Sequence, residues 1–284
     1  MRRLILSISA TATLALAPLA HATTILQING GGFGHGIGMS QYGAYGYALH
    51  GKTYQFILSH YYQGTALGTV NPNQTVRVLI ATGTAGFSGA TSAGAPGAAS
   101  KKLTQGSTYS VRALSGGSVG LYNSAGKKLG SFAAQLTVSG PGPLDLAGHG
   151  AYRGGFEFRP VGSAVATVNA VGLDDYVRGV VAAEMPSSWS MAALEAQAVA
   201  ARTYAITSDV GGNGYQLYPD TRSQMYGGVA AETPSTDAAV AATSGQILTY
   251  QGAPATAYFF SSSGGYTENI ENVWLGAAPE PWLS

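Results

Sequence analysis

The chain has no cysteine and very few charged residues, and both absences limit what it can be. Its 284 residues include 14 Lys and Arg and 13 Asp and Glu, for a formal net charge of +1. Without cysteine, disulfides and thiolate metal sites are excluded, so the fold must be stabilised by burial. A nearly neutral chain also lacks the basic field that nucleic acids and anionic membranes require, so neither is an expected partner.

Histidines and long apolar runs are scarce as well. The histidines are His21, His35, His50, His60 and His149. They show no paired metal-ligand spacing, so we expect no bound metal and no other cofactor. One apolar run, Leu4–Leu19, follows Arg2 and Arg3 and precedes a small-residue cleavage site, which is the pattern of a signal peptide over residues 1–22. The run is too short and too interrupted for a stable membrane span, so we expect a secreted protein, in the periplasm or at the cell wall and outside the cell.

Glycine and tyrosine, in contrast, are abundant, with 41 and 17 residues. Many hydroxyls and few charges suit a neutral, hydroxyl-rich ligand. Glycines are densest over Ile25–Gly38, which predicts a strand that enters a sharply bent loop. Two short helices are expected next, over Ser40–Leu49 and Thr53–Tyr62.

The middle of the chain has the alternating pattern of strands. Apolar runs separated by Gly, Pro and Ser predict a β-rich region over residues 70–170, in which the Gly/Ala/Ser-biased Gly83–Ser100 is expected to be a loop. Helical spacing returns from Leu173 and predicts two helices, the second with Met191 on its buried face. Near the end, Gln246–Tyr250 and Ala255–Phe260 are expected to be strands joined by a short turn.

Glu184 is an isolated carboxylate at the end of the first of these helices. Most glutamates near a helix end are solvated surface groups. Here the preceding residues are apolar, and both partial burial and the negative end of the helix dipole raise the pKa of a carboxyl. A carboxyl with a raised pKa is what glycosidic bond cleavage requires, because the leaving oxygen must be protonated as the bond breaks.

Two further residues have open interpretations. Arg202 lies in an alanine-rich helix, where it is a surface charge that covers apolar area, or a donor to a sugar or to a neighbouring carboxylate. His35 is embedded in glycines that supply no local apolar packing. It is therefore either a site residue or a hydrogen-bonded structural histidine.

Several motifs together resemble the stage II sporulation protein D family, which also contains amidase-enhancer proteins of bacterial cell walls. The strongest is YVRGVVAAEMP at 176–186, followed by ALEAQAVAARTYA at 193–205. The other matching segments are GHGIGMSQYGA at 34–44, SQMYGG at 223–228, FFSSSGGYTE at 259–268 and ENVW at 271–274. With the β-rich middle, the resemblance covers most of residues 23–284.

The resemblance implies a peptidoglycan lytic transglycosylase that cuts the glycan between N-acetylmuramic acid and N-acetylglucosamine, and that acts on strands without stem peptides. Glu184 matches the catalytic glutamate of the family, as general acid and then base. Motif membership and polar chemistry nominate the substrate-binding residues: Arg202, His35, Gln41, Gln224, Tyr226, Ser261 and Ser263. The alternative is a non-catalytic wall-binding protein that enhances an N-acetylmuramoyl-L-alanine amidase, which would then be its partner.

The chain departs from the family in two ways. The histidine-glycine segment lies near the amino end rather than after the segment at 271–274, which indicates a circular permutation. If so, Ile25–Tyr62 should pack beside Ala255–Ser284. Some relatives bind zinc through cysteine and histidine ahead of the segment at 223–228, but here Tyr218–Arg222 stands instead, and we predict no zinc.

These patterns predict an α+β fold, with a β-rich lobe packed against a smaller helical lobe that carries the catalytic Glu184 and has a groove between the two. After the signal peptide, residues 23–284 form one catalytic domain. Its expected parts are the glycine-histidine segment with two helices at 25–62, the β-rich lobe at 70–170, and the catalytic helices and last strands at 171–284.

Overall fold

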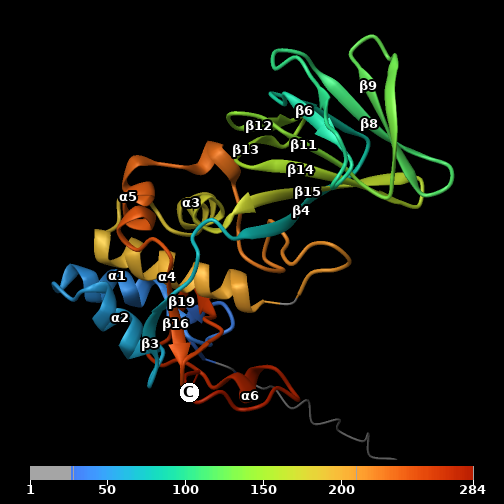
Figure 1. Cartoon of the computed structure of the whole chain (residues 1–284). Helices are drawn as coiled ribbons and strands as arrows, with labels where there is room; N and C mark the ends of the chain where they lie inside the picture. Colours follow the sequence, from blue (N-terminus) through green and yellow to red (C-terminus); the bar gives the residue numbers. More distant parts are fainter. Residues whose placement is uncertain (1–26, 28, 209, 284) are drawn as a thin grey trace, which may run out of the picture. The chain divides into compact units, whose positions relative to one another are not determined.

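The computed structural model describes residues 27, 29–208 and 210–283 (Figure 1). The described residues from Gly31 onward belong to one compact unit. The signal peptide predicted over residues 1–22 lies outside the described residues. Within this unit, the α+β class is confirmed, since helices precede and follow a β-rich part along the chain.

The β-rich lobe contains two six-stranded antiparallel sheets. The first has the spatial order β4 (Thr75–Gly83), β15 (Ala164–Gly172), β14 (Gly155–Val161), β11 (Leu136–Ser139), β6 (Ser92–Gly94) and β7 (Lys101–Lys102). Alternation along β14 separates its two faces, because Phe156 and Phe158 belong to the apolar core while Glu157 and Arg159 point the other way.

The second sheet packs on the apolar face of the first. Its order is β10 (Lys128–Ala133), β9 (Ser118–Asn123), β8 (Tyr109–Leu114), β5 (Ala85–Ser88), β12 (Leu144–Leu146) and β13 (Gly150–Tyr152). The rings of Phe87 on β5 and Phe158 on β14 join the two sheets, with centroids 5.3 Å apart. The loop expected over Gly83–Ser100 is wrong, because β5 and β6 lie within it. Its small residues pair through their backbone and bury one face, including Ala85 and Ala93.

The helical lobe is built around α4 (Met191–Thr207), which the other long helices surround (Figure 1). They are α1 (Gln41–Leu49), α2 (Tyr54–Tyr61), α3 (Leu173–Glu184) and α5 (Pro234–Ala242); η1 (Gly228–Ala231) and α6 (Ile270–Val273) are short. Most of α4 is buried on all sides, because its alanines allow close approach of several neighbours. Met191 is the exception and corrects the predicted buried face, since it stands exposed at the first turn.

The first two predicted helices are confirmed, and their caps explain where they begin. Ser40 accepts a hydrogen bond from the Gly43 amide at the start of α1, and Thr53 accepts one from the Phe56 amide at the start of α2. Side-chain oxygens at these positions satisfy amides that have no partner inside the helix.

Segments from the two ends of the compact unit pair with one another. β1 (Gly32–Phe33) pairs with β19 (Ser262–Ser263), and β2 (Met39–Ser40) lies parallel to β18 (Phe259–Phe260). Gly38 allows this approach because its φ is +73° and any side chain there would collide with the Tyr258 carbonyl oxygen. The packing of these segments that a circular permutation requires is confirmed for the described residues, whereas the permutation itself stays a prediction.

A third, three-stranded sheet has the order β17 (Ala253–Pro254), β16 (Gln246–Tyr250) and β3 (Ala66–Thr69). The predicted strand Gln246–Tyr250 is confirmed, and its turn runs through Gln251 and Gly252, both with positive φ. The strand expected over Ala255–Phe260 is wrong in extent. Only its last two residues form a strand, and they leave the hairpin to pair with β2.

Candidate active site

Glu184 is the last residue of α3. Tyr176, Val177 and Val180 anchor this helix in the core. Met185 then adopts an extended conformation, and Pro186 cannot continue the helix. The helix end therefore holds the carboxyl at the point where the chain turns away.

Both oxygens of the Glu184 carboxyl accept a hydrogen bond. The backbone N–H of Met225 donates to Oε1 over 2.7 Å, and the Gln41 amide donates to Oε2 over 3.2 Å. Gln41 begins α1, and Met225 lies in the loop before η1. Three segments far apart in the sequence thus fix one carboxyl group.

The surroundings raise the pKa of Glu184. Burial is the largest cause, because it penalises the charged form, and the hydrogen bonds from Met225 and Gln41 oppose it by stabilising the carboxylate. The carbonyl end of α3 acts in the same direction as burial. No ion pair involves Glu184 among the described residues, so no cation offsets the desolvation.

A groove of about 560 Å³ opens beside Glu184. Its polar lining comprises His35, Gln41, Thr221, Arg222, Ser223, Gln224 and Ser261, and its larger apolar residues are Phe33, Tyr204, Tyr258, Phe259, Phe260 and Trp274. None of these residues comes from the β-rich lobe. The groove with Glu184 therefore lies within the helical lobe and the strands packed on it, which corrects the position predicted between the lobes.

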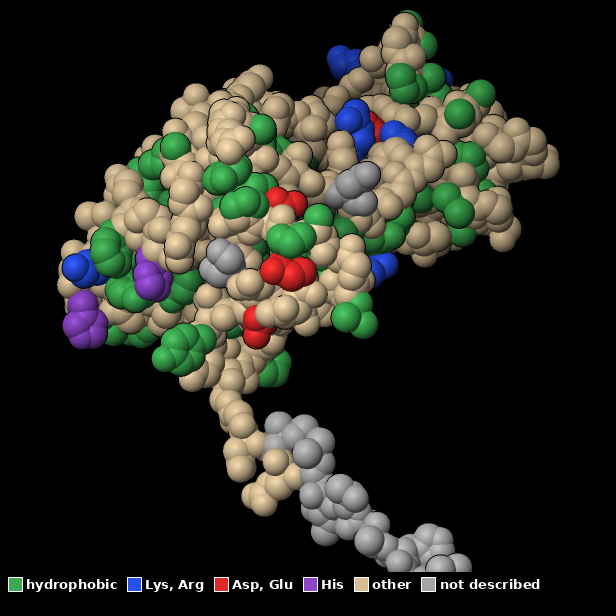
Figure 2. Space-filling view, turned by 90° about the horizontal axis from the view of Figure 1, so that it is seen from below, with side chains coloured by type: hydrophobic (Ala, Val, Ile, Leu, Met, Phe, Trp, Pro, Cys, Tyr) green, Lys and Arg blue, Asp and Glu red, His purple; other side chains and the backbone are tan. Residues whose placement is uncertain are grey.

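Glu184 and Arg222 are the acidic and basic side chains that line the groove. Figure 2 shows one face of the molecule on which acidic and basic side chains are scattered among uncharged and hydrophobic ones. A groove with aromatic walls and uncharged polar groups binds a sugar well, because apolar ring faces pack on aromatic side chains while hydroxyls need hydrogen-bond partners.

His35 lines the groove among aromatic side chains. Its ring packs against Trp274, Phe260 and Tyr258, with centroid separations of 5.3, 5.6 and 6.1 Å. Its Nδ1 accepts a hydrogen bond from the Ile37 amide over 3.0 Å, which leaves the proton of the neutral ring on Nε2. Burial lowers the pKa of His35. The apolar neighbours that the local sequence lacks come from the far end of the chain.

Four of the seven nominated binding residues line the groove, and these are His35, Gln41, Gln224 and Ser261. Gln224 is only 2% exposed, and its amide donates to the Tyr176 hydroxyl and the Ala201 carbonyl. Its Oε1 is buried without a partner in the described part of the chain. Gln41 contacts Glu184 directly, so it positions the carboxyl as well as lining the groove.

The other three nominated residues lie elsewhere, and their assignment is corrected. Arg202 is fully buried, and its Nε donates to Asp174 over 2.6 Å, so it is the donor to a carboxylate that the sequence left as one alternative. Tyr226 is 5% exposed and donates to Asn169 in the core. Ser263 is not among the lining residues, because it pairs with Gly32 at the edge of a small sheet.

Residue-by-residue nomination missed the aromatic walls and one backbone donor. Tyr204 and Trp274 stand inside the motifs at 193–205 and 271–274, so the motifs contained a signal for them. Tyr258 and Phe33 lie beside other motifs. The role of the Met225 N–H could not be predicted from the sequence, because every residue except proline has this group.

No group of three or more potential metal ligands occurs among the described residues. In the segment at 218–222, Arg222 lies over the Tyr218 ring at 3.7 Å and pairs with Asp220. The absence of zinc stays a prediction. In the part of the chain that the structure covers, no helix has the length and hydrophobicity needed to cross a membrane.

Known proteins are similar to parts of this chain. An amidase enhancer of Bacillus subtilis is 45% identical over 103 residues, which cover 36% of this chain and 14% of that protein. Stage II sporulation protein D of the same organism is 40% identical over 144 residues, 42% of each chain. An uncharacterized protein of Brachyspira hyodysenteriae is 37% identical over 131 residues, 45% of this chain and 36% of its own.

The matched segments therefore span less than half the length of these relatives. Residues 161–250, which contain Glu184 and all of α4, match the family model described as stage II sporulation protein. The predicted resemblance to the stage II sporulation protein D family is confirmed by this match and by these relatives.

Proposed function

We propose that the protein is a peptidoglycan lytic transglycosylase in which Glu184 acts first as general acid and then as general base. The family and the names of its relatives support a function related to the cell wall. The observation that carries the finer proposal is a half-buried carboxyl with a raised pKa, held by two donors at the wall of a groove lined with aromatic residues.

In the first step, protonated Glu184 donates its proton to the oxygen that joins muramic acid to glucosamine. The bond between the muramoyl C1 and that oxygen breaks, and positive charge develops at C1. When Glu184 is protonated, the side-chain amide of Gln41 can rotate so that its carbonyl oxygen, instead of its NH₂ group, faces Glu184. This oxygen then accepts a hydrogen bond from the protonated carboxyl.

In the second step, the carboxylate takes the proton of the muramoyl 6-hydroxyl as that oxygen attacks C1. A 1,6-anhydro ring forms, Glu184 recovers its proton, and no water is consumed. The hydrogen bonds from Met225 and Gln41 stabilise the carboxylate between the two steps. One acid is therefore enough, since the same group gives and regains the proton.

Cleavage of purified glycan strands tests the proposal. Strands with and without stem peptides are incubated with the protein, and anhydro-muramoyl products are measured by mass spectrometry. Glu184→Gln keeps size and hydrogen bonding but cannot donate a proton, so product formation should fall by about 10²- to 10⁴-fold. The matched control is Glu195→Gln on α4, where burial also raises the pKa but the side chain does not line the groove. Full activity of Glu184→Gln would refute the proposal.

The second candidate is a binding protein that enhances a cell-wall amidase. The amidase enhancer at 45% identity favours it, and an amidase would then be the partner. In that case neither kind of strand yields anhydro products, and the protein stimulates a purified amidase to the same extent with Glu184→Gln as without it. Either role requires export, which agrees with the predicted secretion to the periplasm or cell wall.

A further inference from the structure

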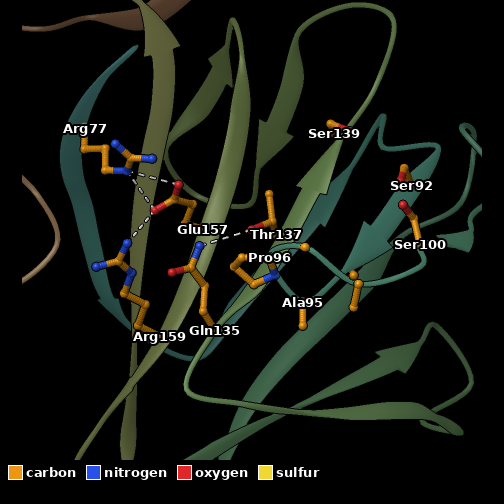
Figure 3. A pocket seen from close by; sticks show the side chains of 13 residues that line it. Arg77, Ser92, Ala95, Pro96, Ser100, Gln135, Thr137, Ser139, Glu157 and Arg159 are labelled. Carbon is orange, nitrogen blue, oxygen red and sulfur yellow. Dashed lines mark hydrogen bonds and ion pairs between the residues drawn. The ribbon is translucent and has the colours of Figure 1, made fainter.

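A second cavity, of about 510 Å³, lies on the β-rich lobe away from Glu184 (Figure 3). It opens on the outer face of the first sheet, opposite the apolar core. Glu157 on β14 lies beside Thr137 on β11, which lies beside Gly94 on β6. The segment Ala95–Ala98 follows β6 and lines the cavity.

Two guanidinium groups meet one carboxylate at one end of this cavity. Glu157 is 4% exposed and accepts hydrogen bonds from Arg77 Nε, 3.1 Å from each oxygen, and from Arg159 Nη2 at 2.7 Å. Figure 3 shows the two arginines approaching it from different directions. The cluster keeps a net charge of +1. One arginine would neutralise Glu157, so the second is not explained by the burial of this acid.

The arginines also have unused donors. Within the described residues, neither terminal nitrogen of Arg77 has a hydrogen-bond partner, and the Arg159 Nε is buried without one. Both side chains keep some exposure, 36% for Arg77 and 22% for Arg159. A planar guanidinium with free N–H groups binds a carboxylate in a forked geometry.

The other end of the cavity is uncharged and rich in hydroxyls. Ser92, Ser100 and Ser139 lie there, apart from the charged cluster, and the remaining lining consists of small residues, Pro96, Thr137 and Gln135 (Figure 3). No large apolar side chain lines the cavity. An occupant therefore needs one anionic group at one end and a body that forms hydrogen bonds.

We propose that this cavity binds a sugar that carries a carboxylate, with Arg77 and Arg159 as donors to the carboxylate and the serine hydroxyls facing the ring. The inference that the ligand carries a carboxylate depends only on the cluster of Arg77, Glu157 and Arg159, but the identity of the sugar rests on the proposed function. In peptidoglycan, carboxylates occur on the lactyl group of a muramoyl residue without its peptide and on the stem peptides. The hydroxyl-rich lining favours the lactyl group.

Nuclear magnetic resonance tests this, because the Nε–Hε signals of arginine report binding at the cluster itself and not at the groove. The probes are N-acetylmuramic acid, N-acetylglucosamine, which has no carboxylate, and D-alanyl-D-alanine, which has a carboxylate but no sugar. N-acetylmuramic acid should shift the Arg77 and Arg159 signals, and the other two probes should leave them unchanged at the same concentration.

Two variants give the matched comparison. Arg77→Gln should weaken the N-acetylmuramic acid effect on Arg159 by about tenfold or more, as expected for a lost charge-assisted contact. Arg112→Gln removes the same charge from β8 on the other sheet, where Arg112 lies over the Tyr122 ring, and binding should stay within about twofold. Thermal unfolding shows whether each variant is folded. If Arg77→Gln does not fold, the comparison of the three probes with the wild-type protein tests the proposal.

Equal shifts with N-acetylglucosamine, or none with N-acetylmuramic acid, would overturn the proposal and leave the cluster as a purely structural ion pair network. Shifts with D-alanyl-D-alanine alone would overturn the sugar assignment. Glu184→Gln should bind N-acetylmuramic acid at the cluster as the wild type does. If the wild-type protein binds N-acetylmuramic acid at the cluster but does not cleave glycan strands, the proposed function has failed; if it cleaves the strands but does not bind at the cluster, this inference has failed.

Discussion

Replacement of Arg202 by methionine should destabilise the protein strongly without altering its affinity for glycan. The Arg202 side chain is fully buried, and its terminal nitrogens donate to the carbonyl oxygens of Ala198, Val240 and Gln246 in addition to the Asp174 contact. One guanidinium thus joins α4 to α3, to α5 and to β16. Methionine fills a similar volume but offers none of these donors.

The loss in the free energy of unfolding depends on the Asp174 carboxylate, which Arg202→Met leaves without its partner. Breaking a buried ion pair by removing one partner costs about 3–5 kcal/mol. Asp174 keeps a side-chain exposure of 16%, so water compensates part of its loss, and we expect about 3–4 kcal/mol. For a domain of this size, about 2–4 °C of melting temperature corresponds to each kcal/mol, which gives a decrease of about 6–16 °C.

Circular dichroism during heating measures this decrease, with Asp174→Asn and the double variant completing a cycle. The double variant should cost less than the sum of the single changes, because the two groups act as a pair. Arg222→Met is the control for melting temperature, since it removes an exposed arginine whose surface pairing with Asp220 should contribute little to stability. An unchanged melting temperature of Arg202→Met, together with a raised KM for glycan, would refute this reasoning and indicate that Arg202 binds the sugar.

Four other predictions concern Glu184, the strand pairing at Gly38 and the metal content. Gln41→Leu removes a donor that lowers the pKa of Glu184, so that pKa should rise further. Because the general acid works protonated, the high-pH limb of the pH–rate profile should move to higher pH, and an unmoved limb would contradict the contact. Glu184 has a raised pKa in the folded state, so stability should fall as pH rises from its unfolded pKa through the raised value and then level off. Urea unfolding should show that Glu184→Gln removes this dependence, and an unchanged slope would argue against burial. Gly38→Ala should cost at least about 1 kcal/mol and separate β2 from β18, because of its positive φ and the Tyr258 carbonyl; a normal melting curve would disprove the close approach. Elemental analysis should find no stoichiometric zinc, and chelators should leave activity unchanged.

Much of the secondary structure could be predicted because local patterns determine it. Tyr176, Val177 and Val180 recur at helical spacing, and Ser40 and Thr53 stand where helix caps are needed. The same reasoning failed over Gly83–Ser100. Small residues have little strand preference of their own, but the neighbouring strands supply backbone partners and a core for Ala85 and Ala93.

The sequence predicted the helix end and the raised pKa of Glu184, but it did not predict the walls of the groove beside it. The helix end and the apolar residues before Glu184 are local features. The aromatic walls come from Phe33, Tyr204 and the segment 258–274, which only the fold brings together. The charge of Arg202 indicated a donor, but nothing local revealed that Asp174 and three carbonyl groups surround it.

The two contacts that Glu184 makes matter in both halves of the proposed reaction. Burial alone would raise the pKa further, and the carboxyl would then be a weaker acid in the first step, although its carboxylate would be a stronger base in the second. The donors from Met225 and Gln41 partly offset the burial, because they stabilise the carboxylate that exists between the steps. With no ion pair at Glu184 in the described residues, the pKa is set by these opposing effects and not by a neighbouring charge. A carboxyl that must give a proton and then regain it is best served by such a balance, since strong bias to either form would slow one of the two transfers.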